Sequence, residues 1–246
     1  MGTADIHIHT TLSDGMGSVA QALEYIAANP GLDVVAITDH DDITGGLMAK
    51  DMAQKMGYPF EVVVGAEITT LEGHLLALFL TSPVPNLRSL SQTIKAIHAQ
   101  NGICIAPHPM SWFTHSIGQR SLENIFSSVD PDVYFDGIEV VNASPAGHIT
   151  EAKVKKLNGD RYHLPELGSS DAHFIQSIGM GVTVFQGSSA EELKDSIISG
   201  TTSAAGSYLG LSDIGWTNLI RQQFRSLVLT PTRGLRRPLH KLLRGW

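Results

Sequence analysis

Short apolar runs alternate with amphipathic segments along most of the chain. Several of the runs are apolar without a break and are bounded by turn residues, which is typical of strands buried on both faces of a sheet. We expect strands at 34–37, 60–67, 73–80, 102–108, 137–142 and 182–185, and helices at 19–28, 44–57, 88–101, 146–157 and 189–199. This alternation predicts an α/β fold, a (β/α) barrel or a close variant with about seven strands.

The first candidate for chemistry lies near the N-terminus, in the segment Asp-Ile-His-Ile-His at 5–9. Alternate side chains of a strand share a face, so His7 and His9 point in one direction. Asp14 follows in a loop, just before the flexible Gly15, and adds a carboxylate. The segment therefore supplies half of a metal site. By itself, a histidine pair on a strand more often lies on a solvated face or has a structural role than binds metal, so the rest of the chain decides between the two interpretations.

Similar side chains recur where the later strands end or begin. His40 follows the strand at 34–37 in the sequence Thr-Asp-His-Asp-Asp, a segment that is also suited to capping the next helix. Further donors stand at the ends of the following apolar runs: Glu67, His74, His108, Asp171 and His173. Since α/β proteins build their sites at the carboxyl ends of parallel strands, we expect these side chains to meet on one rim.

Nine ionisable donors on one rim are costly unless they coordinate cations. With three or four protein ligands per ion and one bridging carboxylate, the set suffices for two to three divalent metals. None of the donors is a thiolate, which favours Zn, Mn or Fe. The single cysteine, Cys104, has apolar neighbours in its strand and is interpreted as a core residue.

Charge is distributed unevenly along the 246 residues. The net charge is −7, but residues 207–246 carry seven Lys and Arg and one acid, whereas residues 1–206 carry a large excess of acids. An acidic body suits a site that concentrates divalent cations. One cysteine, no secretory leader and no apolar run long enough to span a bilayer favour a cytoplasmic protein.

The ordered motifs HxHTxxSDG, TDHD, GxE, GHxL, a buried strand ending in His108, and SDAH resemble the polymerase and histidinol phosphatase (PHP) family of metal-dependent phosphoesterases. The resemblance covers residues 5–205, and the closing segment at 168–183 resembles the C-terminal section of the small stand-alone members. It implies a distorted (β/α)7 barrel with a trinuclear centre. By motif, His7, His9, Glu67 and Asp171 would hold the first metal. Glu67, as a bridge, would hold the second with His74 and His108, and Asp14, His40 and His173 would hold the third.

The resemblance also suggests a mechanism. A hydroxide that bridges the first two metals would attack the phosphorus, and the third metal would bind a phosphate oxygen. Glu67 and Asp171 would hold the reacting centre, and His173 or a metal-bound water would assist the leaving alkoxide. Asp39 is expected to orient a neighbouring imidazole.

The substrate is less well defined by the sequence. A small phosphomonoester or nucleotide is the leading interpretation, with Arg120, His115 and Asn142 as candidate substrate contacts. For Arg120 and His115 a surface loop position is an equally good interpretation. Exonucleolytic or phosphodiester cleavage of short oligonucleotides is an alternative, although it would need a basic groove. A non-catalytic metal-binding regulatory module is a further alternative.

Residues 207–246 form a basic amphipathic tail after a phosphoesterase domain at 1–206. Its apolar stripes and arginines suit packing on the barrel or on a second copy of the chain, which would make a homo-oligomer. The same pattern also suits an anionic membrane surface, so a peripheral membrane contact is the alternative. We expect no stable nucleic-acid partner.

Overall fold

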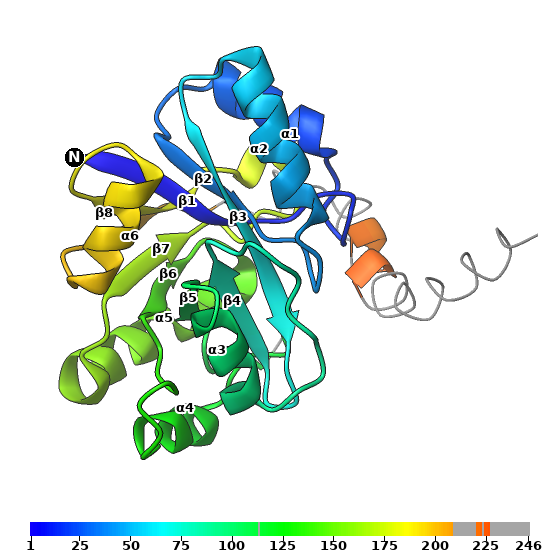
Figure 1. The fold of residues 1–246 in the computed structure, drawn as a ribbon. Helices are drawn as coiled ribbons and strands as arrows, with labels where there is room; N and C mark the ends of the chain where they lie inside the picture. The colour runs from blue at the N-terminus through cyan, green and yellow to red at the C-terminus, as the bar shows by residue number, and fades with distance from the viewer. Residues whose placement is uncertain (113, 209–219, 223, 227–246) are drawn as a thin grey trace, which may run out of the picture.

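The computed structural model describes residues 1–112, 114–208, 220–222 and 224–226 (Figure 1). One sheet of nine strands organises the chain, in the order β7-β6-β5-β4-β3-β2-β1-β8-β9. The strands are β1 (Gly2–Ile8), β2 (Val34–Ile37), β3 (Glu61–Thr69), β4 (His74–Leu78), β5 (Ile103–Ala106), β6 (Gly137–Asn142), β7 (Glu166–Ser169), β8 (Gly181–Phe185) and β9 (Ser203–Gly206).

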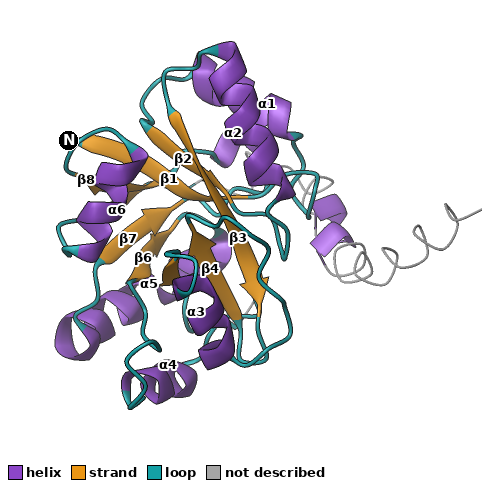
Figure 2. Cartoon of the chain, in the orientation of Figure 1, coloured by secondary structure: helices purple, strands orange, loops and turns teal. Residues whose placement is uncertain are grey.

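Six α-helices of the described residues lie on the outside of the curved sheet (Figure 2). They are α1 (Val19–Ala28), α2 (Thr44–Met56), α3 (Leu90–His98), α4 (Gln119–Phe126), α5 (Pro145–Leu157) and α6 (Ala190–Ile198). A π-turn at Asn158–Tyr162 extends α5, and a 3-10 turn lies at Ile175–Ser177. Capping boxes start three of the helices, at Ser18 for α1, at Ser89 for α3 and at Ser189 for α6.

The sheet nearly closes on itself. β1, β2 and β3 are parallel, as are β5, β6 and β7, and the antiparallel β4 joins the two groups. A parallel bridge from Ile8 to Ala172 and hydrogen bonds between the Thr183 hydroxyl and the backbone of Gly168 bring the β7 end back to β1 and β8. The predicted barrel is therefore confirmed, with nine strands in place of about seven.

Two antiparallel pairings of the sheet join strands that are near each other in the sequence. β3 and β4 form a hairpin in which Thr69 lies opposite His74, and β9 pairs antiparallel with β8. The sequence of β9, Ser-Ala-Ala-Gly, has neither apolar alternation nor β-branched residues, which explains why its pattern did not predict a strand.

The apolar residues of the strands and the inner faces of the helices form three packed clusters, and the rim beside them carries the polar residues. Cys104 is fully buried in one of these clusters, as expected for a core residue. Within the described part of the chain, none of the helices combines the length and apolar character needed to cross a bilayer. Of the predicted tail, residues 209–219, 223 and 227–246 lie outside the described residues.

Candidate metal centre

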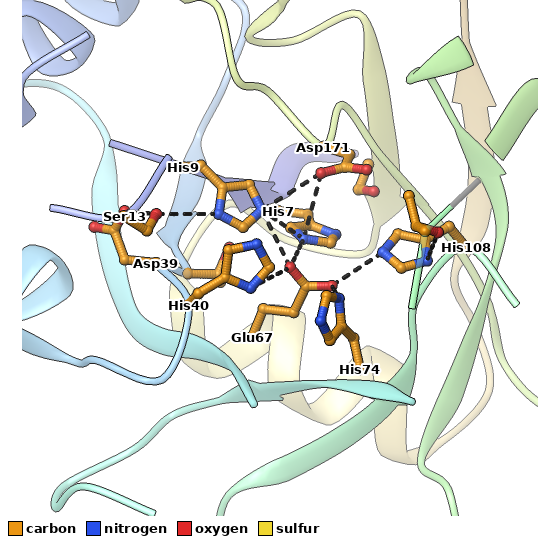
Figure 3. A network of polar contacts seen from close by, with 12 residues as sticks. His7, His9, Ser13, Asp39, His40, Glu67, His74, His108 and Asp171 are labelled. Carbon is orange, nitrogen blue, oxygen red and sulfur yellow. Dashed lines mark hydrogen bonds and ion pairs between the residues drawn. The ribbon is translucent and has the colours of Figure 1, made fainter. Parts of the chain in front are cut away.

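All nine predicted donors meet on one rim of the barrel. Figure 3 labels all of them except Asp14 and His173. Strand β1 supplies His7, and the loop that follows it supplies His9 and Asp14. The short bridge between His40 and Glu67 brings the end of β2 to β3. The remaining donors come from the start of β4 and from the segments after β5 and β7: His74, His108, Asp171 and His173.

Glu67 lies between two sets of imidazoles. Its Oε1 is 3.0 Å from a nitrogen of His74 and 3.0 Å from one of His108. Its Oε2 lies 3.2 to 3.4 Å from nitrogens of three other rings, those of His7, His9 and His40. The two oxygens of one buried carboxylate thus face different ligand sets, which is the arrangement required of a carboxylate that bridges two metal ions.

The donor set fits a divalent cation. The Nδ1 of His7 donates to Glu139 Oε1 at 2.9 Å, because a carboxylate can only accept. In the neutral ring the Nε2 lone pair of His7 then faces His9 Nε2 at 3.1 Å and Asp171 Oδ1 at 3.6 Å. Ligand atoms around a tetrahedral ion with bonds of about 2.1 Å stand about 3.4 Å apart. These potential ligand atoms therefore stand close to the spacing that a bound ion imposes.

Four overlapping groups place donor atoms close enough together to share an ion. They are His9, Asp14, His40 and His173; His7, His9 and Asp171; His7, Glu67 and His108; and His40, Glu67 and His74. The predicted third set lies together and gains His9. The predicted second set is divided between two groups that share Glu67. The number of ions stays a prediction.

Electrostatics separates the histidines into two kinds. Burial, with His9 and His74 nearby, lowers the pKa of His40 to about 3 despite Glu67 and Asp14, so this ring is neutral and free to ligate. Burial also disfavours charge on His9, but Asp171 and Glu67 outweigh it and raise its pKa to about 10. Without metal, His9 carries a proton that a cation must displace.

Residues around the donors hold them in place. The carboxylate of Asp39 accepts hydrogen bonds from Thr10 N, Thr10 Oγ1 and Ser13 Oγ, and Ser13 Oγ lies 3.5 Å from His9 Nδ1. Asp39 thus orients the loop that carries His9 and reaches the imidazole through Ser13, a more indirect contact than the sequence suggested.

Glu139 was missed by the sequence reasoning. It is buried in β6 and accepts hydrogen bonds from His7 Nδ1, the backbone nitrogen of His108, Ser169 Oγ and Asn142 Nδ2. Burial disfavours its charge, but His7, Ser169 and His108 outweigh it and lower its pKa. The available signal was a single acid inside an otherwise apolar strand, which must find partners in the core.

The three candidate substrate contacts occupy different positions. The Asn142 amide is buried and directed at Glu139 and Asp171, at 2.8 and 3.5 Å. The His115 ring packs edge-on against His74, with centroids 5.3 Å apart, so it lies on the rim of the centre. Arg120 is exposed in the first turn of α4, and no described contact joins it to the donors. Substrate binding by these residues stays a prediction.

The comparisons with known proteins agree with this geometry. The PHP domain model matches residues 5–179, and a PHP-associated model matches residues 158–202. An uncharacterized protein of Methanocaldococcus jannaschii is 40% identical over 151 residues, covering 57% of this chain and 81% of that protein. The phosphoribosyl 1,2-cyclic phosphate 1,2-diphosphodiesterase of Eggerthella lenta is 32% identical over 104 residues, covering 39% of this chain and only 38% of the relative.

Among solved structures, a two-domain protein from Bacteroides vulgatus that contains a predicted PHP-like metal-dependent phosphoesterase superposes with a TM-score of 0.67. The two chains are 18% identical, and the superposition covers 91% of this chain and 69% of the Bacteroides vulgatus chain. This likeness supports the barrel fold. The PHP domain model matches most of this chain, and every donor of the motifs lies on one rim. The chain therefore belongs to the PHP family and is a metal-dependent phosphoesterase.

Proposed function

We propose that this protein hydrolyses a small phosphomonoester or a nucleotide with two to three divalent ions, Zn, Mn or Fe, held by the nine donors. The observation that carries the proposal is the position of Glu67, whose two oxygens face separate sets of imidazoles. A bridging carboxylate holds two ions close enough to act on one phosphoryl group.

The bound ions would neutralise the phosphate oxygens and lower the pKa of a water to give the nucleophile, so no side chain needs to attack phosphorus. The protein's part is to present neutral nitrogens and ionised carboxylates. Glu67 and Asp171 are suited to this, because nearby histidines outweigh burial and hold their pKa values well below the usual range. His40, with its lowered pKa, contributes a neutral ring.

Differences in exposure suggest the side from which substrate approaches. The side chains of His7 and His9 are fully buried, whereas those of His40, His74 and His173 are 10%, 16% and 19% exposed. His173 therefore lies on the open side of the centre, and the role we propose for it there is to hold an ion whose bound water would assist the leaving alkoxide. The Nε2 of His173 lies 3.2 Å from Asp14. Burial disfavours a charged ring, but the Asp14 carboxylate outweighs it, so the pKa of His173 is raised.

Hydrolysis of a phosphodiester is the second candidate. The relative from Eggerthella lenta carries a diphosphodiesterase name, and its similarity to this chain favours the candidate. A diester bears one negative charge fewer than a monoester and so requires less neutralisation by the protein. The two candidates use the same donors. They differ in whether the open side of the centre accommodates a second ester group on the phosphorus.

The test begins with protein purified without chelator and analysed for metals per chain. p-Nitrophenyl phosphate, bis-p-nitrophenyl phosphate and a panel of nucleotides are then assayed with added Mn, Zn or Fe. Two to three metals and release of phosphate from the monoesters would support the leading proposal. Faster cleavage of the bis ester would favour the second candidate, and full metal occupancy without any hydrolysis would favour a regulatory metal-binding module.

The variants Asp171→Asn and His9→Ala should lose metal-dependent activity by orders of magnitude, because each removes a ligand from the buried side of the centre. His148→Ala is the matched control, since His148 is a histidine with a side chain 60% exposed and lies outside the donor groups. Full metal-dependent activity in Asp171→Asn would contradict the proposal.

A further inference from the structure

A short piece of the C-terminal region lies beside the metal centre. Residues 220–222 and 224–226 are helical and lie next to the loop that follows β1, where the orange segment meets the blue chain in Figure 1. Gln222 is buried, whereas Ile220 and Phe224 are 67% and 56% exposed. The described part of the tail therefore contacts the barrel through polar side chains and turns its apolar residues outward.

Gln222 reaches a metal donor directly. Its Nε2 lies 3.5 Å from Asp14 Oδ2, the same oxygen that His173 Nε2 contacts at 3.2 Å. The other oxygen, Oδ1, is buried without a hydrogen-bond partner and lies 3.7 Å from nitrogens of both His9 and His40. One oxygen of Asp14 is thus held by donors, and the other is directed into the donor group.

Arg225 fastens the segment at this place. Its Nη2 lies 3.1 Å from the carbonyl oxygen of Thr11 and 3.2 Å from that of Ser13, in the loop that leads to Asp14. Residues three apart share one face of a helix, so Gln222 and Arg225 reach the same loop together. These two hydrogen bonds from one guanidinium to backbone carbonyls hold the helical segment beside the loop that carries Asp14.

We propose that Gln222 is a positioning residue of the metal centre, which orients Asp14 so that Oδ1 faces the ion shared with His9, His40 and His173. The amide suits this task, because it donates to the carboxylate without adding a charge that would repel the ion. The proposal rests on the proposed function only in requiring that the centre binds metal. If the proposal holds, the metal affinity of the group that contains Asp14 depends on the segment around Gln222, which lies far along the chain from the motif donors.

The experiment measures Mn²⁺ binding to the metal-free 246-residue chain by electron paramagnetic resonance, separately from turnover. Gln222→Ala and Gln222→Met are compared with the unaltered protein. Methionine keeps the size of the side chain and removes its donor. We expect both variants to weaken one class of bound Mn²⁺ roughly tenfold or more, as removal of a hydrogen bond to a ligating carboxylate does, and to leave the other Mn²⁺ sites unchanged.

Arg221→Ala is the matched control, because Arg221 lies on the same turn with an exposed side chain. Arg225→Ala should weaken the same Mn²⁺ site by releasing the segment. Unaltered Mn²⁺ affinity in both Gln222 variants would overturn the inference, even in an active enzyme. Unaltered affinity in Gln222→Met alone would overturn it too, since packing would then suffice. Metal binding without hydrolysis would count against the proposed function and leave the comparison of affinities valid. No Mn²⁺ binding by the unaltered protein would overturn both.

Discussion

Replacing Glu139 by glutamine changes one oxygen of a buried carboxylate into an amide. Oε1 of Glu139 accepts from His7 Nδ1 and Ser169 Oγ, and Oε2 accepts from the backbone nitrogen of His108 and from Asn142 Nδ2. An amide nitrogen facing His108 would oppose a backbone donor that cannot change. The nitrogen is therefore expected to face His7, and to donate to its Nδ1.

The imidazole of His7 must then take the other tautomer, with a proton on Nε2. That proton points at His9 Nε2, 3.1 Å away, and occupies the direction in which a metal would bind. Loss of the charge-assisted hydrogen bond is expected to cost about 1–3 kcal/mol of stability. The mispositioned tautomer should weaken metal binding roughly 10- to 100-fold, the range found when partners of ligating histidines are altered.

The assay combines thermal unfolding, a chelator competition for metal affinity, and nitrogen-15 NMR of the histidine rings, which reports the tautomer directly. Glu61→Gln serves as the control, because Glu61 is an exposed acid whose carboxylate accepts a hydrogen bond from the backbone nitrogen of Ala190, away from the metal centre. An unchanged metal affinity in Glu139→Gln, with His7 still protonated at Nδ1, would refute the reasoning.

Three further outcomes are expected. In protein from which a chelator has removed metal, the folded-state pKa of His9 is about 10, against an ordinary 6.5. The stability that protonated His9 contributes is therefore fully present below pH 6.5 and is lost as the pH rises through 10. The melting temperature of the metal-free form should fall over this range more than that of the metal-loaded form, and parallel pH profiles would contradict this. Gly15→Ala should lower the melting temperature and weaken metal binding, because the new Cβ would overlap the backbone of His9; wild-type values for both would argue against it. Cys104→Ala should keep its activity and lose on the order of 1 kcal/mol, while native Cys104, whose thiol pKa is raised by burial, should resist alkylation until the protein unfolds.

The donors of the centre were predictable because their signals are local. Alternation along the segment at 5–9 predicted that His7 and His9 share one face, although β1 ends at Ile8 and His9 begins the loop. The ends of apolar runs mark His40, Glu67 and His108. A general rule, that the carboxyl ends of parallel strands share one edge, then brings them together. The described structure confirms the α/β barrel and the convergence of these side chains.

The residues that support the donors were harder to predict because their roles depend on long-range contacts. Glu139 is one acid in an apolar strand, and no local feature of the sequence indicates that it would hydrogen-bond to His7. The approach of Gln222 to Asp14 joins segments with unrelated patterns. The amphipathic character of the tail was visible in the sequence, but the surface that its described part contacts follows only from the folded barrel.

The bridge between Ile8 and Ala172 also affects how the protein folds. It pairs the end of the first strand with a segment that follows the seventh, and Asp171 and His173 flank it. During synthesis, β1 emerges long before its partner, so the centre is assembled only when most of the domain has left the ribosome. Contacts of such long separation slow folding, and a metal captured at this stage would stabilise the barrel at the point where it closes.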